Sequence, residues 1–321
     1  MGEPPKEGLF LRLHTKHGDR LLWFIILALV GIASIVIRLL IEYQFHTTAL
    51  LYVAVPYGIA FALAMIRTPE DKTWWMAFLD HGLKALIVFL ASSVVLFEGF
   101  VCVVFFMPIY FLGFTIAFIG TWLSRTARSD RVRAIALAIP VLVFASSLEG
   151  TSESLSFARD ERITVSRTVA LTPEAVLANL ARPIELGEPE ALILSVFPMP
   201  YRVDSGSLSP GDIHTVHTRY HRWFVTNTHE GEMRLRIHDV GTDFVVTEFL
   251  EDTSYFSNYL TMHGTRIDLT PLDDGRTTIT LQLEYTRLLD PAWYFGPIQR
   301  HAVSRMGAML IDDIMVRADA R

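Results

Sequence analysis

The 321-residue chain is poor in cysteine and, over most of its length, in lysine. Its one cysteine, Cys102, lies within an apolar run, so no intrachain disulfide can form and cysteine usage says nothing about the redox compartment. No lysine follows Lys84. From Thr151 to Arg321 there are 16 Arg against 24 Asp and Glu, a formal charge of −8. This acidic balance disfavours nucleic acid as a partner.

The sequence also lacks the short motifs of the large enzyme classes. No nucleophile elbow, phosphate loop, dinucleotide fingerprint or zinc-protease motif occurs in it. Three histidines, His214, His217 and His221, suggest a zinc site. The residues around them predict a strand, however, which puts His217 and His221 about 13 Å apart on one face and His214 on the other. We therefore expect no metal and no cofactor.

What the chain has in excess is apolar sequence, nearly all of it before Glu149. The composition is 51% hydrophobic and the mean hydropathy is +0.35, which is high for a soluble protein. After a tail, residues 1–20, we expect about five membrane-spanning helices, of which the third and fourth form a hairpin with its tip near Glu98 to Pro108. The expected spans are 21–41, 49–66, 83–99, 106–123 and 132–148.

Charges between these spans predict the side that each loop faces. Lys and Arg occur in the tail, between the second and third spans, and between the fourth and fifth, but not in the other short loops. The positive-inside rule then places the tail in the cytoplasm of a bacterium and everything after Glu149 outside its inner membrane, in the periplasm or cell exterior. A four-span alternative, with 83–123 partly re-entrant, leaves the C-terminal domain cytoplasmic.

After a polar linker, residues 149–161, the remainder (162–321) predicts a globular α+β domain. Arg162 to Ala170 alternates as a strand, and Thr172-Pro173-Glu174 opens a helix with a capping threonine and a proline in its first turn. Asp290-Pro291 begins a long amphipathic helix that ends the chain. Between the two helices we expect six antiparallel strands, at 191–197, 212–227, 232–240, 243–253, 264–271 and 276–287.

That order, with the T-x-E-x-V start of the first helix and the segment DDGRTTITLQLEYT before the last one, resembles the START-like (SRPBCC), or helix-grip, superfamily. The likeness covers 162–316 and is greatest to the polyketide cyclase and lipid-transfer branch. It implies a curved antiparallel sheet around the C-terminal helix, with an apolar cavity between them for a lipid, sterol or polyketide. Family members share no common catalytic residues, so none is assigned here.

Side-chain alternation identifies the residues that face this cavity, or that fill a solid core in its place. The residues alone leave both alternatives open, and the resemblance favours the cavity. The inward set is Leu235, Ile237, Ile267, Leu269, Ile279, Leu281 and Leu283 on the strands, with Val303, Met306 and Leu310 on the helix.

The opposite face of the sheet is rich in arginine and histidine. It is either a solvated face balanced by acidic neighbours or a basic patch that meets anionic lipid headgroups. Its members include His217, Arg219, His221, Arg234 and Arg236.

The leading hypothesis is therefore a membrane-anchored protein that binds or transfers a hydrophobic, lipid-like ligand, with the bilayer and that ligand as its partners. One alternative is an enzyme acting on a hydrophobic substrate, such as a cyclase, with His217, Arg219 or Glu248 as acid or base. Another is a structural or signalling module with a packed core.

Overall fold

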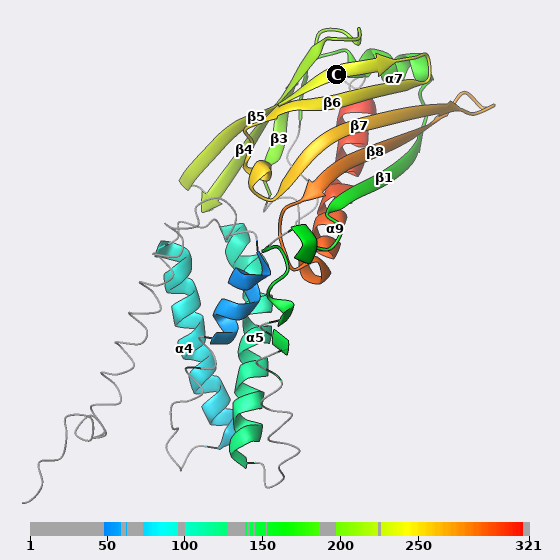
Figure 1. Cartoon of the computed structure of the whole chain (residues 1–321). Helices are drawn as coiled ribbons and strands as arrows, with labels where there is room; N and C mark the ends of the chain where they lie inside the picture. The colour runs from blue at the N-terminus through cyan, green and yellow to red at the C-terminus, as the bar shows by residue number, and fades with distance from the viewer. Residues whose placement is uncertain are drawn as a thin grey trace, which may run out of the picture.

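The chain combines an apolar helical hairpin with a curved β-sheet that wraps a long helix (Figure 1). The computed structural model describes residues 48–58, 62, 73–95, 100–126, 139, 142–143, 145–151, 153–186, 197–223 and 226–316. The sheet and its helix have the α+β helix-grip architecture expected for the C-terminal part of the chain.

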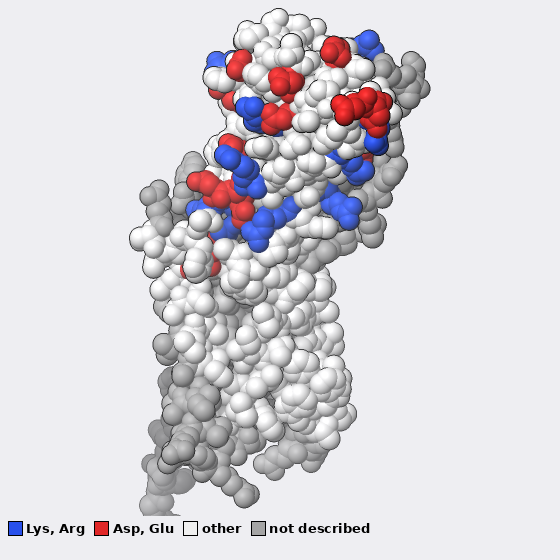
Figure 2. Space-filling view, turned by 90° about the vertical axis from the view of Figure 1, so that its right-hand side faces the viewer, with Lys and Arg blue, Asp and Glu red and all other residues white. Residues whose placement is uncertain are grey.

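The hairpin consists of α4 (Trp74–Val95) and α5 (Phe100–Thr126). Each contains a stretch long and apolar enough to cross a membrane, and they are the two helices of this kind among the described residues. On α4, the residues Leu79, Leu83 and Ile87 are 55% to 59% exposed. Figure 2 shows the charged side chains gathered on the sheet domain, whereas most of the helical surface in view has none.

The apolar stretch of α5 that could cross a membrane, Phe105–Leu123, nearly coincides with the predicted span 106–123, whereas that of α4, Trp74–Ala91, begins earlier than the predicted span 83–99. α4 begins at Trp74, and Lys84 and Asp80 pair at 2.7 Å one helical turn apart within it, so their charges do not interrupt the helix. α5 begins at Phe100 and continues through Pro108, so the predicted hairpin tip does not extend over 100–108. Residues 1–20, the span 21–41, part of 49–66 and most of 132–148 lie outside the described residues, so five spans stay a prediction.

Eight strands within the described residues form one antiparallel sheet in the order β1-β8-β7-β6-β5-β4-β3-β2. The first strand therefore lies beside the last, while all other neighbours follow one another in the chain. Along β8 every second side chain is buried, Ile279, Leu281 and Leu283 among them, as the sequence alternation predicts. The strands are β1 (Asp160–Val169), β2 (Ile184–Glu185), β3 (Met199–Asp204), β4 (Ile213–Trp223), β5 (Thr226–Val240), β6 (Phe244–Asp252), β7 (Leu260–Pro271) and β8 (Thr277–Arg287).

Two helices complete the domain. The predicted cap of α7 (Pro173–Leu180) is confirmed, since the Thr172 hydroxyl accepts a hydrogen bond from the Ala175 amide at 3.4 Å. α9 (Ala292–Leu310) lies on the concave side of the sheet (Figure 1) and continues as a π-helical segment, Ile311–Val316. At Gly307 a Cβ would lie 3.1 Å from Leu283 Cδ1, so glycine lets the helix approach the sheet closely.

The structure differs from the strand prediction in two places. β5 runs straight through 228–231, the gap between the predicted strands 212–227 and 232–240 that was expected to turn, and Gly231 pairs with Thr218. Glycine stands there because a Cβ would collide with the Thr253 carbonyl, not because the chain turns. Pro198 and Pro200, which follow the strand predicted at 191–197, lie at the start of β3, while 191–196 itself lies outside the described residues.

Candidate functional site

A cavity lies where the hairpin meets the sheet domain, and we call it the seam cavity. Its volume of about 50 Å³ holds about four water-sized spheres at roughly 10–15 Å³ each. Binding sites for drug-sized ligands have about 300–1,000 Å³, so a lipid enters only when the walls move. The lining residues are Phe105 and Phe106 of α5; Phe295, Ile298, Gln299, Ala302, Val303 and Met306 of α9; and Phe197, Phe256, Tyr259, Leu260 and Leu289 from the sheet domain.

One face of α9 forms the largest wall of the seam cavity. Phe295, Gln299, Ala302 and Met306 follow one another at intervals of three or four residues, which places them on the same side of the helix. Sequence analysis found the later part of this stripe but not the earlier part, because the amide of Gln299 interrupts the apolar pattern.

The aromatic residues Phe105 and Phe106 bring the hairpin into the wall. The Phe106 ring centroid lies 4.3 Å from that of Tyr52 and 5.5 Å from that of Phe295, and the Phe105 centroid lies 5.4 Å from that of Phe197. Tyr52 belongs to the π-helical segment Leu50–Ala54, which precedes the hairpin. Sequence analysis missed this contact, because the residues are far apart in the chain and no local pattern connects them.

Of the ten residues predicted to line a cavity, Val303 and Met306 line the seam cavity. The others belong to the main hydrophobic core or pack against it. In this conformation the strand residues therefore meet α9 as a packed core, and their contact with a ligand stays a prediction. These eight are Leu235, Ile237, Ile267, Leu269, Ile279, Leu281, Leu283 and Leu310.

Four ionisable side chains meet at the first turn of α9. Arg287 Nη1 donates to Asp290 Oδ1 at 2.6 Å, and Arg159 Nη2 donates to Asp290 Oδ2. Arg287 is 1% exposed and Asp290 is fully buried. Glu149 Oε1 accepts a hydrogen bond from the Ala292 amide at 2.8 Å, and burial raises the pKa of the Glu149 carboxyl. This buried cluster holds the beginning of α9 in place beside the seam cavity.

The cluster changes the interpretation of the segment 149–161, which the sequence marked as a polar linker. Its first residue, Glu149, is buried, and its carbonyl accepts a hydrogen bond from the Ala49 amide at 3.1 Å. The start of the segment is therefore packed and is not a loose tether. The alternation along β8 already indicated a buried arginine, since Arg287 follows Leu283 and Tyr285 on the buried side of the strand.

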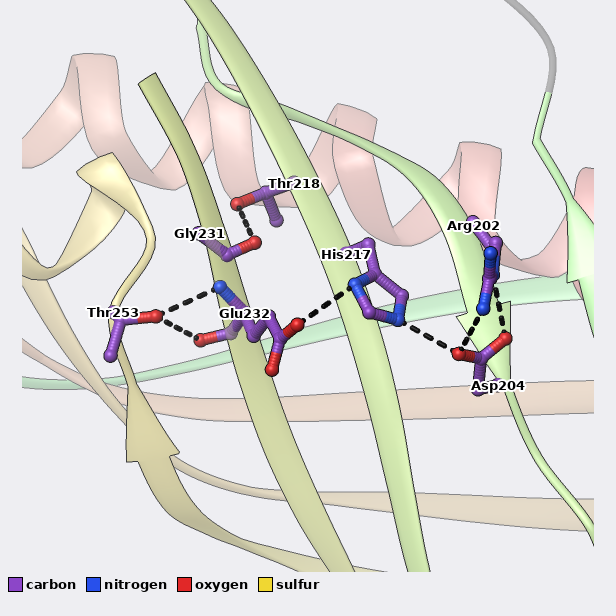
Figure 3. A network of polar contacts seen from close by, with 7 residues as sticks. All are labelled: Arg202, Asp204, His217, Thr218, Gly231, Glu232 and Thr253. Carbon is purple, nitrogen blue, oxygen red and sulfur yellow. Dashed lines mark hydrogen bonds and ion pairs between the residues drawn. The ribbon is translucent and has the colours of Figure 1, made fainter.

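On the outer face of the sheet, His217 bridges two carboxylates. Its Nε2 lies 2.9 Å from Asp204 Oδ2, and its Nδ1 lies 3.2 Å from Glu232 Oε1 (Figure 3). Hydrogen bonds from Arg202 and from His217 lower the pKa of Asp204 to about 2. The other predicted polar residues pair likewise: Arg219 with Glu230, Arg234 with Glu251, and Arg236 with Glu248.

These pairs favour a solvated face over a patch that binds anionic lipid, because each of these cations already has a carboxylate partner. The side chain of His221 lies outside the described residues. In the part of the chain that the structure describes, no group of three or more His, Cys, Asp or Glu side chains is placed to hold a metal ion.

Comparison with solved structures finds weak similarities over about half of this chain. The chain is similar to the ZhuI aromatase/cyclase from Streptomyces sp. R1128, with 15% identity over 50% of this chain and 95% of that one and a TM-score of 0.34. It is also similar to a START superfamily protein from Mycobacterium smegmatis, with 12% identity over 50% of this chain and 97% of that one and a TM-score of 0.33. A third similar structure is truncated norcoclaurine synthase from Thalictrum flavum, with 11% identity over 49% of this chain and 95% of that one and a TM-score of 0.30.

No protein-family model matches the chain, and no curated protein matches it either. Because all three TM-scores are below 0.5, the assignment of a helix-grip architecture rests on the strand order and on the position of α9.

Proposed function

We propose that this chain is a membrane-anchored protein whose helix-grip domain binds a hydrophobic, lipid-like ligand and exchanges it with the bilayer. The observation that carries the proposal is the shared wall of the seam cavity, which α9 of the domain forms together with Phe105 and Phe106 of an apolar hairpin. With α4 and α5 in a membrane, the cavity lies where a lipid tail would leave the bilayer. Its apolar lining suits hydrocarbon, whose burial contributes about 25 cal/mol per Å².

Two features of the hairpin support this placement. Leu79, Leu83 and Ile87 form an exposed apolar stripe on α4, and a surface of this kind is unfavourable in water. Trp74 begins α4 and Trp122 lies near the end of α5, and these helix ends lie away from the sheet (Figure 1). The two ring centroids are 6.2 Å apart, and tryptophans at the end of a spanning hairpin are typical of aromatic anchors at a membrane surface.

The sequence around the hairpin supports a location of the domain outside the cytoplasm. In the sequence, Lys72 precedes α4, and Arg125 and Arg128 lie at or after the end of α5, so basic residues flank the helix ends that point away from the domain. By the positive-inside rule that end faces the cytoplasm of a bacterium. Alkaline phosphatase fused after Arg321 should then be active, whereas an inactive fusion would place the domain in the cytoplasm.

The acid and base candidates of the enzyme alternative do not line the seam cavity. His217 and Arg219 lie on the outer face of the sheet, where Glu248 pairs with Arg236. Ligand binding and exchange therefore fit the geometry better than acid–base catalysis by these residues.

Native mass spectrometry of the full-length chain, extracted from membranes in mild detergent, tests the proposal. Ala302 lines the seam cavity, whereas Ala308 lies on the same helix and outside the lining. Ala302→Leu and Ala308→Leu add the same three carbons to two half-buried sites. We expect the wild type and Ala308→Leu to retain a lipid and Ala302→Leu to lose it.

The comparison of the two variants separates a cavity lipid from lipids around the helices, which both retain equally. Thermal unfolding establishes that both are folded. An equal amount of bound lipid in the two folded variants, or none in the wild type, would refute the proposal. Turnover of an added hydrophobic substrate by the wild type would point to the enzyme alternative.

A further inference from the structure

Gln299 brings a hydrogen-bonding amide into a cavity wall that is otherwise aliphatic or aromatic. The residue is 8% exposed and lies on α9 between Phe295 and Val303. None of the residues that line the seam cavity carries a charge. Besides the hydroxyl of Tyr259, the amide of Gln299 is the polar side-chain group of this wall, so it can indicate the head of a ligand.

Neighbouring groups determine which way this amide points. Gln299 Nε2 lies 3.0 Å from the carbonyl oxygen of Tyr259. A carbonyl oxygen accepts and never donates, so the NH₂ group must face it. The same oxygen accepts a hydrogen bond from the Leu288 amide at 3.0 Å, which holds it in place. Gln299 Oε1 is consequently the free end of the amide. It is buried without a hydrogen-bond partner among the described residues, so a ligand reaches it only when the cavity walls move.

We propose that the seam cavity selects uncharged lipids whose head carries a hydroxyl group, and that this hydroxyl donates a hydrogen bond to Gln299 Oε1. The inference rests on the proposed function of the cavity. A buried acceptor without a partner costs free energy, which a donor on the ligand recovers. An ether or a plain hydrocarbon leaves the acceptor unpaired. A carboxylate or phosphate head brings a charge into a wall without a compensating cation.

Three radiolabelled probes with the same chain and different heads test this selectivity on the full-length protein in detergent: oleyl alcohol, oleyl methyl ether and oleate. Binding is measured relative to protein-free micelles, which removes differences in partitioning. We expect the alcohol to bind about tenfold more tightly than the ether, the effect of one net hydrogen bond, and oleate to bind most weakly.

Two variants link the preference to the amide. Gln299→Met keeps a side chain of similar length without the acceptor, so the alcohol and the ether should bind it equally. Ser304→Ala removes a hydroxyl from the same helix outside the lining and should keep the preference.

The wild-type measurement alone decides the inference, whether or not the variants fold. Equal binding of alcohol and ether, or a preference for oleate, overturns it and leaves the proposed function standing. If none of the three probes binds, the proposed function fails as well.

Discussion

The Tyr294 hydroxyl donates a hydrogen bond to the backbone carbonyl of Phe105 at 2.5 Å. This bond joins the first turn of α9 to α5, and the aromatic contacts of Phe106 and Phe295 lie beside it. The domain is therefore packed onto the hairpin. Any opening of the seam cavity toward the hairpin has to change these contacts.

Tyr294→Phe should weaken the junction by about 1 kcal/mol, because it removes the hydrogen bond while the ring stays. Thermal unfolding of the full-length chain in detergent measures the loss. Protease cleavage near the junction should also become faster. An unchanged unfolding temperature would mean that the bond does not contribute to the packing of the domain onto α5.

The same substitution at Tyr285 should have the opposite sign. The Tyr285 side chain is buried, its hydroxyl has no partner among the described residues, and burial raises its pKa to about 12. Tyr285→Phe removes a polar group that folding had to desolvate, so we expect stability to stay equal or to rise by up to about 1 kcal/mol. Comparison with Tyr294→Phe controls for the chemical change. A clear loss of stability would show that the hydroxyl has a partner, such as an ordered water molecule.

Arg287→Met should destabilise the protein by about 3–5 kcal/mol, because it removes one member of a buried ion pair and leaves the Asp290 carboxylate without it. Arg234→Met is the matched control at an exposed pair with Glu251, where the expected loss is about 0–1 kcal/mol. Chemical unfolding of the two variants measures both losses. Equal effects would contradict the buried character of the cluster.

Asp204→Asn should lower stability at neutral pH and have no effect in strong acid. The pKa of Asp204 is lowered to about 2 by Arg202 and His217, against about 3.9 in an unfolded chain. The carboxylate therefore stabilises the fold above about pH 4 and loses this contribution as the pH falls toward about 2. Melting curves of both proteins between pH 2 and 7 should converge in that window, and a constant difference would contradict the assignment.

Local chemistry made the repetitive parts of this protein predictable. Alternation along β8 predicted its buried face, and Thr172 with Pro173 predicted the start of α7. The prediction was less accurate where one residue type is compatible with two different local structures. Gly231 permits a close approach of strands and not a turn, and the neighbouring charges Asp80 and Lys84 neutralise each other inside a helix.

The sequence by itself determined a helix-grip order of strands and helices after an apolar region, because side-chain periodicity and capping depend on residues close together in the chain. Only the tertiary structure decided where the open space lies. The residues predicted to line it pack mostly into the core, and the seam cavity forms where Phe106 of the hairpin meets Phe295 and the rest of the α9 wall. Such a cavity depends on how segments distant in the chain pack together, and no local pattern contains that information.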